Sequence, residues 1–294
     1  MKSGFVSLVG RPNVGKSTLI NSLVGSKVAI VSNKSQTTRN NIQGIYNDAE
    51  TQMVFIDTPG IHKPNNKLGE YLNKQAYYSL SDSDVILFLT DVTKAIGSGD
   101  KFVLDKIKEA NRPVILVINK IDKISKEELI TKISDYNSLY EFADIVPISA
   151  LKKSNIKELI KVIRTYLKDE IKYYDDNQVT NKSTRFLISE MIREKVFNLT
   201  EQEVPHSVTC VVEDISKSKD KYVINASIIV DRESLKKIIL GKQGSMIKKI
   251  GTLARSDIEE LLGSKIYLDL FVKVIKKWRD QERYLKEFGF DEFE

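Results

Sequence analysis

The sequence predicts two domains: an α/β domain with a mostly parallel sheet, followed by a smaller α+β domain. The 294 residues are enough for two domains. Strand-like and helix-like segments alternate from residue 5 to residue 167, which is typical of a parallel sheet covered by helices. After residue 183 the order changes to helix, strand, strand, helix, helix, strand. The predicted divisions are a first domain at residues 1–170, a polar linker without a clear hydrophobic face at 171–182, and a second domain at 183–294.

Hydrophobic periodicity gives the elements of the first domain. Strands are expected at residues 5–9, 42–46, 52–56, 85–90, 114–118 and 145–148. Helices are expected at 16–24, 68–80, 100–110, 126–140 and 156–167. The strands on either side of residues 47–51 predict a hairpin, the one antiparallel pair. In such sheets ligands bind at the carboxyl ends of the strands, so the motifs that directly follow strands are the candidates for a ligand-binding site.

Composition favours a soluble globular protein. Apolar residues make up 41% and charged residues 29%, and no apolar run reaches the length of a membrane span. The N-terminus leads into a strand instead of a signal-peptide core, so we expect a cytoplasmic protein. The single cysteine, Cys210, lies in a strand-like run and is expected to be a small buried hydrophobe. The sequence has no cluster of cysteine and histidine, so no zinc site is predicted.

The segment from Gly10 to Ser17 fits the phosphate-binding pattern G-x-x-x-x-G-K-[ST] between a predicted strand and a predicted helix. Glycines let the backbone turn so that successive N–H groups and a helix N-terminus face negative oxygen atoms. Lys16 adds a cation for the β- and γ-phosphates, and Ser17 offers a hydroxyl to Mg²⁺. The nucleotide-contacting residues predicted here are Gly10, Arg11, Pro12, Asn13, Val14, Gly15, Lys16, Ser17 and Thr18.

A second motif follows the strand predicted at residues 52–56. It consists of Asp57, Thr58, Pro59 and Gly60. Asp57 is placed to hold Mg²⁺ through a water molecule, and the amide of Gly60 is placed to meet a γ-phosphate. The same residues also fit an ordinary turn.

A polar segment, residues 26–41, separates the phosphate loop from Asp57 and has the character of a switch. A loop that senses the γ-phosphate needs a hydroxyl or carbonyl that binds Mg²⁺ only in the triphosphate state. We choose Thr38 for this role, and Thr37 is the open alternative.

Base recognition is predicted at two further strand ends. The residues concerned are Asn119, Lys120, Ile121, Asp122, Ser149, Ala150 and Leu151. A carboxylate at Asp122 accepts hydrogen bonds from N1–H and the 2-amino group of guanine, whereas adenine turns an acceptor toward it. A backbone amide in the segment from Ser149 to Leu151 is placed to meet the guanine O6. In this order, the four motifs indicate a GTPase of the translation-factor class.

The second domain carries a G-x-x-G segment, Gly241 to Gly244, between two predicted helices. Its elements are expected at residues 184–198 (helix), 208–214 and 222–230 (strands), 234–240 and 245–262 (helices) and 265–274 (strand). This is the order of a KH module of the bacterial, type II arrangement. The amphipathic tail at 276–288 carries Trp278, which we expect to anchor a terminal helix; stacking on a base is the alternative.

Five lysines and no acidic residue lie between residues 236 and 249. A lysine run is often only a solvated helix face. Beside a G-x-x-G loop it indicates a clamp for the backbone of single-stranded RNA. The RNA-contacting residues predicted are Gly241, Lys242, Gln243, Gly244, Ser245, Lys248, Lys249 and Arg255, with an apolar groove wall of Ile238, Ile239, Met246 and Ile250.

The chain resembles the Era family, in the TrmE–Era–EngA branch of P-loop GTPases. The resemblance runs nearly from end to end. It rests on Gln-Thr-Thr-Arg at 36–39, Asp-Thr-Pro-Gly-Ile-His at 57–62, Asn-Lys-Ile-Asp at 119–122 and Ile-Leu-Gly-Lys-Gln-Gly-Ser-Met-Ile-Lys-Lys-Ile-Gly at 239–251. It implies a P-loop GTPase domain followed by a type II KH domain. It also implies a GTP-hydrolysing switch that binds the 3′ end of small-subunit (16S) rRNA during assembly of the 30S subunit.

The resemblance implies GTP or GDP and Mg²⁺ as ligands, the small ribosomal subunit as partner, and a cytoplasmic protein with peripheral association to the inner membrane. We expect a monomer that does not bind DNA.

Small signalling GTPases have a glutamine after the motif at 57–60 that orients the attacking water, whereas this chain has Ile61. We count Ile61 among the nucleotide-contacting residues, together with Thr58, Pro59 and Gly60. GTPases of this branch that carry an asparagine at the position of Asn13 often use it to hold K⁺. The catalytic residues expected are Asn13, Lys16, Thr38 and Gly60, and the metal ligands are Ser17, Thr38 and Asp57.

Three other functions are compatible with parts of the pattern. One is a metabolic P-loop NTPase or nucleotide kinase, against which the guanine-selecting Asp122 argues. The second is a GTPase that acts on another RNA. The third is an RNA-binding protein with a vestigial nucleotide site.

Overall fold

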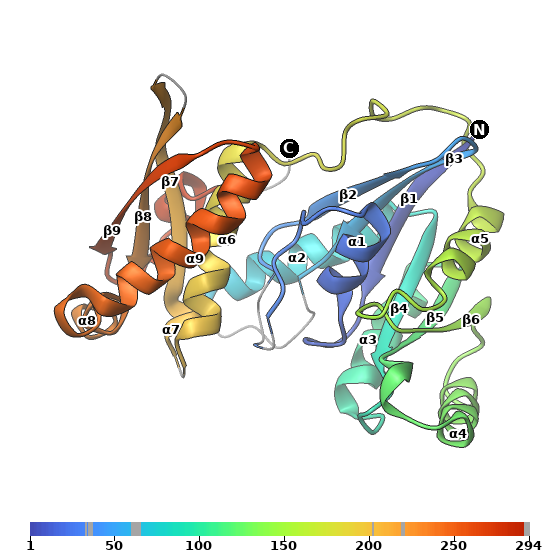
Figure 1. Ribbon diagram of the computed structural model, residues 1–294. Coiled ribbons are helices and arrows are strands. Elements are labelled where there is room, and N and C mark those ends of the chain that lie inside the picture. The colour runs from blue at the N-terminus through green and yellow to red at the C-terminus, as the bar shows by residue number, and fades with distance from the viewer. Residues whose placement is uncertain (33, 35–37, 60–65, 202, 219–220, 291–294) are drawn as a thin grey trace. The chain divides into compact units, whose positions relative to one another are not determined.

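The computed structural model describes residues 1–32, 34, 38–59, 66–201, 203–218 and 221–290 (Figure 1). The predicted site residues Thr37, Gly60 and Ile61 lie outside this range. Contacts divide the chain into two compact units: Met1–Ala29, Thr38–Pro64 and Leu72–Asn181 form the first, and Ile30–Thr37, Asn65–Tyr71 and Lys182–Glu294 form the second. Within the described residues, none of the helices combines the length and the hydrophobicity needed to cross a membrane.

The first unit is built on a six-stranded sheet. Its strands are β1 (Lys2–Val9), β2 (Ile42–Asn47), β3 (Thr51–Asp57), β4 (Val85–Asp91), β5 (Val114–Asn119) and β6 (Asp144–Ile148). The helices of this half of the chain are α1 (Lys16–Val24), α2 (Lys67–Ser81), α3 (Ser98–Glu109), α4 (Lys126–Asn137) and α5 (Ile156–Tyr166). The strand order is β2-β3-β1-β4-β5-β6, and only β2 runs antiparallel to its neighbour. The predicted α/β class with one antiparallel strand is confirmed.

A tight turn makes β2 the antiparallel strand. The amide of Asp48 donates to the carbonyl of Thr51 at 2.9 Å, and the Asp48 side chain accepts from the Glu50 amide at 2.9 Å. A connection this short reverses the chain and leaves no room for a crossover helix. The hairpin predicted from the residues on either side of this turn is therefore present.

Alternation along the strands divides the hydrophobic core into two layers. Val85, Leu87 and Leu89 of β4 pack in a cluster with side chains of α1 and α5. Ile86 and Phe88 of the same strand pack with α2, α3 and α4. Because helices cover both faces, the loops that carry the motifs are left at the carboxyl ends of the strands.

The segment predicted as a linker is hydrogen-bonded to the first unit as far as its last residues. The amide of Ile45 in β2 donates to the carbonyl of Val179 at 2.9 Å, and Gly44 forms an antiparallel bridge with Thr180. The buried Gln52 accepts hydrogen bonds from the amides of Tyr173 and Tyr174 at 2.7 and 3.0 Å. The segment needs no hydrophobic stripe because hydrogen bonds along the free edge of β2 hold it.

The second unit contains a three-stranded sheet in the order β7-β8-β9. Its strands are β7 (Val208–Ser218), β8 (Lys221–Val230) and β9 (Ile266–Val274), and its helices are α6 (Thr184–Leu199), α7 (Val204–Ser207), α8 (Glu233–Leu240), α9 (Ser245–Leu262) and α10 (Glu282–Glu287). The β7–β8 pair is antiparallel and the β8–β9 pair is parallel. Buried side chains of α6, α8 and α9 pack on one face of this sheet, which confirms the α+β class of the second domain.

Two residues predicted in the groove wall are instead part of the core of the second unit. Ile239 and Ile250 are fully buried and pack with the strands, so their assignment to the groove was wrong. The helical period identifies the apolar face but does not tell a core position from a groove position. Ile238 is 47% exposed. Cys210 is buried in the same core, as predicted.

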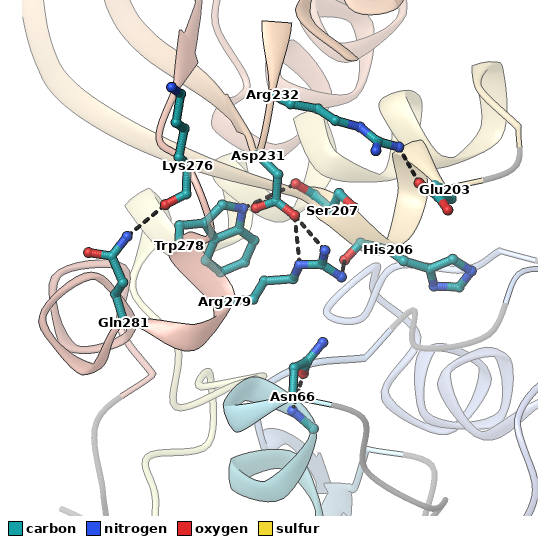
Figure 2. A network of polar contacts seen from close by, with 11 residues as sticks. Asn66, Glu203, His206, Ser207, Asp231, Arg232, Lys276, Trp278, Arg279 and Gln281 are labelled. Carbon is teal, nitrogen blue, oxygen red and sulfur yellow. Dashed lines mark hydrogen bonds and ion pairs between the residues drawn. The ribbon is translucent and has the colours of Figure 1, made fainter. Parts of the chain in front are cut away.

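Trp278 anchors the tail, as predicted, and is too buried to stack on a base. Its indole N–H donates to the carbonyl of Ser207 at 3.1 Å (Figure 2). The neighbouring Arg279 donates to the carboxylate of Asp231 at 2.9 Å through Nε and to the carbonyl of His206 at 3.4 Å (Figure 2). These contacts fix the chain after β9 to the end of β8 and to α7.

Candidate functional site

The phosphate loop lies between β1 and α1 and is held close to the end of β5. Gly15 has a φ of 106°, and a Cβ at this position would lie 2.3 Å from Nδ2 of Asn119. Only glycine satisfies both the backbone angle and the close approach. The glycine at this position of the motif is therefore required by the close packing against Asn119 as well as by the binding of phosphates.

Asn119 joins three of the predicted motifs. Its Nδ2 donates to the carbonyl of Val14 in the phosphate loop at 2.8 Å. Its Oδ1 accepts from the amide of Lys120 at 2.8 Å and from the amide of Ala150 at 3.0 Å. One buried side chain thus sets the distance between the phosphate loop and both loops predicted to recognise the base.

The three predicted metal ligands meet beside the start of α1. The hydroxyl of Ser17 donates to Oδ2 of Asp57 at 2.7 Å, and the hydroxyl of Thr38 donates to the same oxygen at 3.0 Å. The two hydroxyls lie 3.1 Å apart. The other oxygen of Asp57 is buried and has no hydrogen-bond partner among the described residues. A carboxylate and two hydroxyls are hard oxygen ligands, so this group of residues fits Mg²⁺.

Burial shifts the pKa values of two charged side chains of this site away from their ordinary values. It lowers the pKa of Lys16, although Asp57 acts in the opposite direction. It raises the pKa of Asp57, although Lys16, Ser17 and Thr38 act in the opposite direction. Lys16 donates to the carbonyls of Gly10 and Arg11 at 3.1 and 3.4 Å. Phosphates beside Lys16 and a cation beside Asp57 favour the charged forms of both side chains.

The predicted base-binding residues also lie together. Oδ1 of Asp122 accepts from the hydroxyl of Ser149 at 2.5 Å, which orients the carboxylate. Lys120 donates to the carbonyl of Asn13 at 2.9 Å and to Asp91 at 2.6 Å. Burial acts to raise the pKa of Asp91, but hydrogen bonds from Lys120 and Thr93 outweigh it and lower that pKa, so this carboxylate stays ionised. Asp91 was not predicted; its place at the carboxyl end of β4 was the available signal.

The hydroxyl of one predicted nucleotide contact and the backbone amide of another have partners within the protein. The hydroxyl of Thr58 is buried and donates to the carbonyl of Leu8 at 2.7 Å. The amide of Ala150 donates to Asn119. Leu151, which follows Ala150, is 72% exposed.

In the second unit, the G-x-x-G segment forms a tight turn between α8 and α9. Gly241 has a φ of 69°, and a Cβ there would lie 2.7 Å from the Cβ of Met246. The predicted side chains that extend from or follow this turn are at least partly exposed: Lys242, Gln243, Ser245, Lys248, Lys249 and Arg255. Lysines and an arginine around exposed backbone form a surface suited to phosphates.

A cavity of about 310 Å³ lies between α9 and β9. Its lining residues are Ile247, Lys248, Gly251, Thr252, Arg255, Ile266, Tyr267, Leu268 and Leu270. Two predicted residues, Lys248 and Arg255, line it, whereas Lys249 does not. Thr252 and Tyr267 were missed, although Thr252 is one turn beyond Lys248 on the same helix. Tyr267 is 56% exposed, so its ring is accessible for stacking on a base.

Known proteins match both units. A family model described as 50S ribosome-binding GTPase matches residues 5–120, and a KH domain model matches residues 203–279. The structure of a singly substituted Era from Aquifex aeolicus, bound to GDP·AlF4⁻, is 43% identical, with 99% of each chain covered and a TM-score of 0.95. A structure of Era in complex with MgGDPNP and nucleotides 1506–1542 of 16S ribosomal RNA is 42% identical, with the same coverage and TM-score.

The chain belongs to the Era family. The resemblance found in the sequence is thereby confirmed over the whole chain, and so are the two kinds of domain. This Era-family protein is a GTPase by its family. The roles of its individual residues stay predictions, which the geometry above supports for Lys16, Ser17, Thr38, Asp57 and Asp122.

Proposed function

We propose that this protein is a GTP-hydrolysing switch that binds the 3′ end of 16S rRNA and acts in the assembly of the small ribosomal subunit. The observation that carries the proposal is the meeting of Ser17, Thr38 and Asp57 beside the phosphate loop, in a chain that also has a basic G-x-x-G clamp. Related Era proteins have been crystallised with a GTP analogue and with this part of the rRNA, which supports the same ligands here.

Residues of the first unit bind the triphosphate and select its base. Backbone amides of the phosphate loop and the ammonium of Lys16 surround the phosphates. The hydroxyls of Ser17 and Thr38 and, through a water molecule, Asp57 would hold Mg²⁺, which would supply positive charge beside the phosphates. Asp122, oriented by Ser149, accepts two hydrogen bonds from guanine.

Residues of the second unit hold single-stranded RNA. The turn at Gly241 to Gly244 brings phosphates close to the amides that begin α9, and Lys242 and Lys248 add positive charge. The cavity between α9 and β9 receives bases, with Arg255 and Tyr267 as groups that stack on them. The groove wall is therefore made by residues of β9 as well as of α9.

GTP and RNA binding are linked through the segments around Thr38 and Asp57, which a bound γ-phosphate and Mg²⁺ order. If GTP strengthens RNA binding, RNA strengthens GTP binding by the same factor. We expect an oligonucleotide of the 16S 3′ end to bind with different affinities in the presence of a GTP analogue, GDP and no nucleotide, and a fluorescence anisotropy titration measures this. Equal affinities in the three states would remove the coupling.

Tyr267→Ala provides the RNA-side variant for these titrations. Loss of a stacking ring is expected to cost about 1–3 kcal/mol of RNA affinity in every nucleotide state. The matched control is Tyr78→Ala, which removes a similarly exposed tyrosine from α2. An unchanged affinity for Tyr267→Ala would remove Tyr267 from the RNA site, and binding of unrelated RNA with equal affinity would favour a GTPase that acts on another RNA.

We also propose that K⁺ at Asn13 stimulates GTP hydrolysis in place of a glutamine. Turnover is expected to be slow in Na⁺ and faster in K⁺ at equal ionic strength. Asn13→Ala is expected to remove the difference between the two ions without removing nucleotide binding. Release of phosphate measured in both salts tests the proposal, which fails if the ions give equal rates.

Three finer features belong to the same proposal: a monomer, a cytoplasmic location, and peripheral association with the inner membrane. The family resemblance supports the location and the membrane association, and the composition also favours a cytoplasmic protein. Analytical ultracentrifugation of the pure protein tests the first, and its distribution between the cytosol and salt-washed membranes tests the other two.

A further inference from the structure

We propose that Asp100 positions the phosphate loop by holding the side chain of Arg11. The proposal rests on the nucleotide site described above and adds a positioning residue from α3, an element that carries none of the nucleotide motifs. It explains why the side chain of Arg11 lies against the start of α3 and does not extend into solvent.

A buried carboxylate receives the guanidinium. Nη1 of Arg11 donates to Oδ2 of Asp100 at 2.9 Å, and the amide of Gly97 donates to the same oxygen at 2.8 Å. The side chain of Asp100 is 3% exposed, whereas that of Arg11 is 38% exposed. Asp100 is thus fixed by the start of its own helix, and the more exposed arginine is fixed by Asp100.

Two glycines at the start of α3 make room for the arginine. A Cβ at Gly99 would lie 3.3 Å from Cδ and 3.4 Å from Cγ of Arg11, and a Cβ at Gly97 would lie 3.5 Å from Nη1. The whole length of the side chain therefore lies against this helix terminus. Both ends of Arg11 are constrained, one by the loop backbone and one by the ion pair.

The backbone of Arg11 is part of the phosphate-binding apparatus. Its carbonyl accepts a hydrogen bond from the ammonium of Lys16 at 3.4 Å, beside the carbonyl of Gly10 at 3.1 Å. At the other end of the loop, Asn119 holds the carbonyl of Val14. Asp100 and Asn119 thus fix the loop at two points before a nucleotide arrives, which lowers the entropy lost on binding.

Burial of Asp100 predicts an unequal effect of removing the two partners. Without Arg11, the Gly97 amide is the one donor that the described residues leave to this carboxylate, which becomes a poorly compensated buried charge. Without the charge of Asp100, the exposed guanidinium turns to water. Arg11→Met is therefore expected to weaken nucleotide binding more than Asp100→Asn does. Adding Asp100→Asn to Arg11→Met is expected to restore part of the lost affinity.

The test compares GDP dissociation and GTP turnover in the full-length variants. Arg11→Met is expected to speed GDP dissociation roughly tenfold and to raise KM by a similar factor, with kcat within about twofold of the wild type, because the Arg11 guanidinium is bound to Asp100 and serves to position the loop. The double variant Arg11→Met with Asp100→Asn is expected to release GDP roughly threefold more slowly than Arg11→Met alone, and its KM is expected to be lower by a similar factor. Lys106→Met is the matched control, since it removes an exposed ion pair from the same helix.

Each outcome decides the proposal. Arg11→Met behaving like Lys106→Met, additive losses in the double variant, or a fall in kcat with unchanged KM would overturn it. If Arg11→Met does not fold, Gly99→Ala displaces the same side chain by a smaller amount, and unchanged GDP dissociation in that variant would likewise overturn it. Failure of the wild type and of Lys106→Met to bind GDP would instead reject the nucleotide site itself.

Discussion

Replacing Lys16 with alanine will lower kcat/KM for GTP by about 10³-fold or more, because the variant loses the charge that stabilises the phosphates in the transition state. Lys16 is buried against the phosphate loop and is held there by the carbonyls of Gly10 and Arg11. The other cation of the loop, the Arg11 guanidinium, is bound to Asp100 and does not substitute for it. Phosphate release under multiple turnover measures the effect.

A stability measurement separates loss of function from loss of folding. Burial lowers the pKa of Lys16, so burying its protonated form costs stability, and this penalty is relieved as pH rises through the lowered pKa. The variant Lys16→Met, which is similar in size, removes this penalty but also removes the positive charge beside the buried Asp57, so the unfolding midpoint of the nucleotide-free protein is expected to stay close to that of the wild type. Lys94→Ala, an exposed lysine after β4, is the control with wild-type turnover. Full activity in Lys16→Ala would revive the vestigial-site hypothesis.

Asp122→Asn is expected to change the base that the protein accepts. An amide loses both hydrogen bonds from guanine and offers a donor to the 2-oxo group of xanthine, so the preference between GTP and XTP should reverse by several kcal/mol, on the scale of about 10³-fold or more. The substitution keeps an oxygen for the Ser149 hydroxyl, so the local geometry is retained. Competition of GTP, XTP and ITP against a fluorescent GDP analogue measures the change.

ITP provides an internal control for this experiment. Inosine lacks the 2-amino group, so the wild type should bind ITP more weakly than GTP, while Asp122→Asn should discriminate little between the two. An unchanged base preference in Asp122→Asn would place the base elsewhere and would favour a metabolic P-loop enzyme over a guanine-selective switch.

Much of the site was predictable because its residues stand next to strands. Lys16, Asp57, Asp122 and Ser149 each follow an apolar strand, and the parallel sheet brings these strand ends to one edge. The G-x-x-G turn was predictable because it joins two helices and needs a positive φ at Gly241. These patterns depend only on residues that are close in sequence, so they can be recognised in a single sequence without a structure.

Residues that act through a distant partner were not predicted. The end of a strand made Asp91 a candidate, but its ion pair with Lys120 depends on the fold. Asp100 stands in an ordinary helical context, and its role becomes visible only when the fold brings Arg11 to it. Tyr267 is similar, because an aromatic residue in a strand is equally typical of core and of surface.

The order of the motifs along the chain by itself determined the two domain types, and it predicted a guanine nucleotide and single-stranded RNA as ligands. Only the tertiary structure decided that Thr38 meets Ser17 and Asp57, that Asn119 joins three loops, and that Ile239 and Ile250 belong to the core. Motifs depend on neighbours in sequence, whereas these contacts depend on which faces and strand ends the packed sheet brings within hydrogen-bond distance.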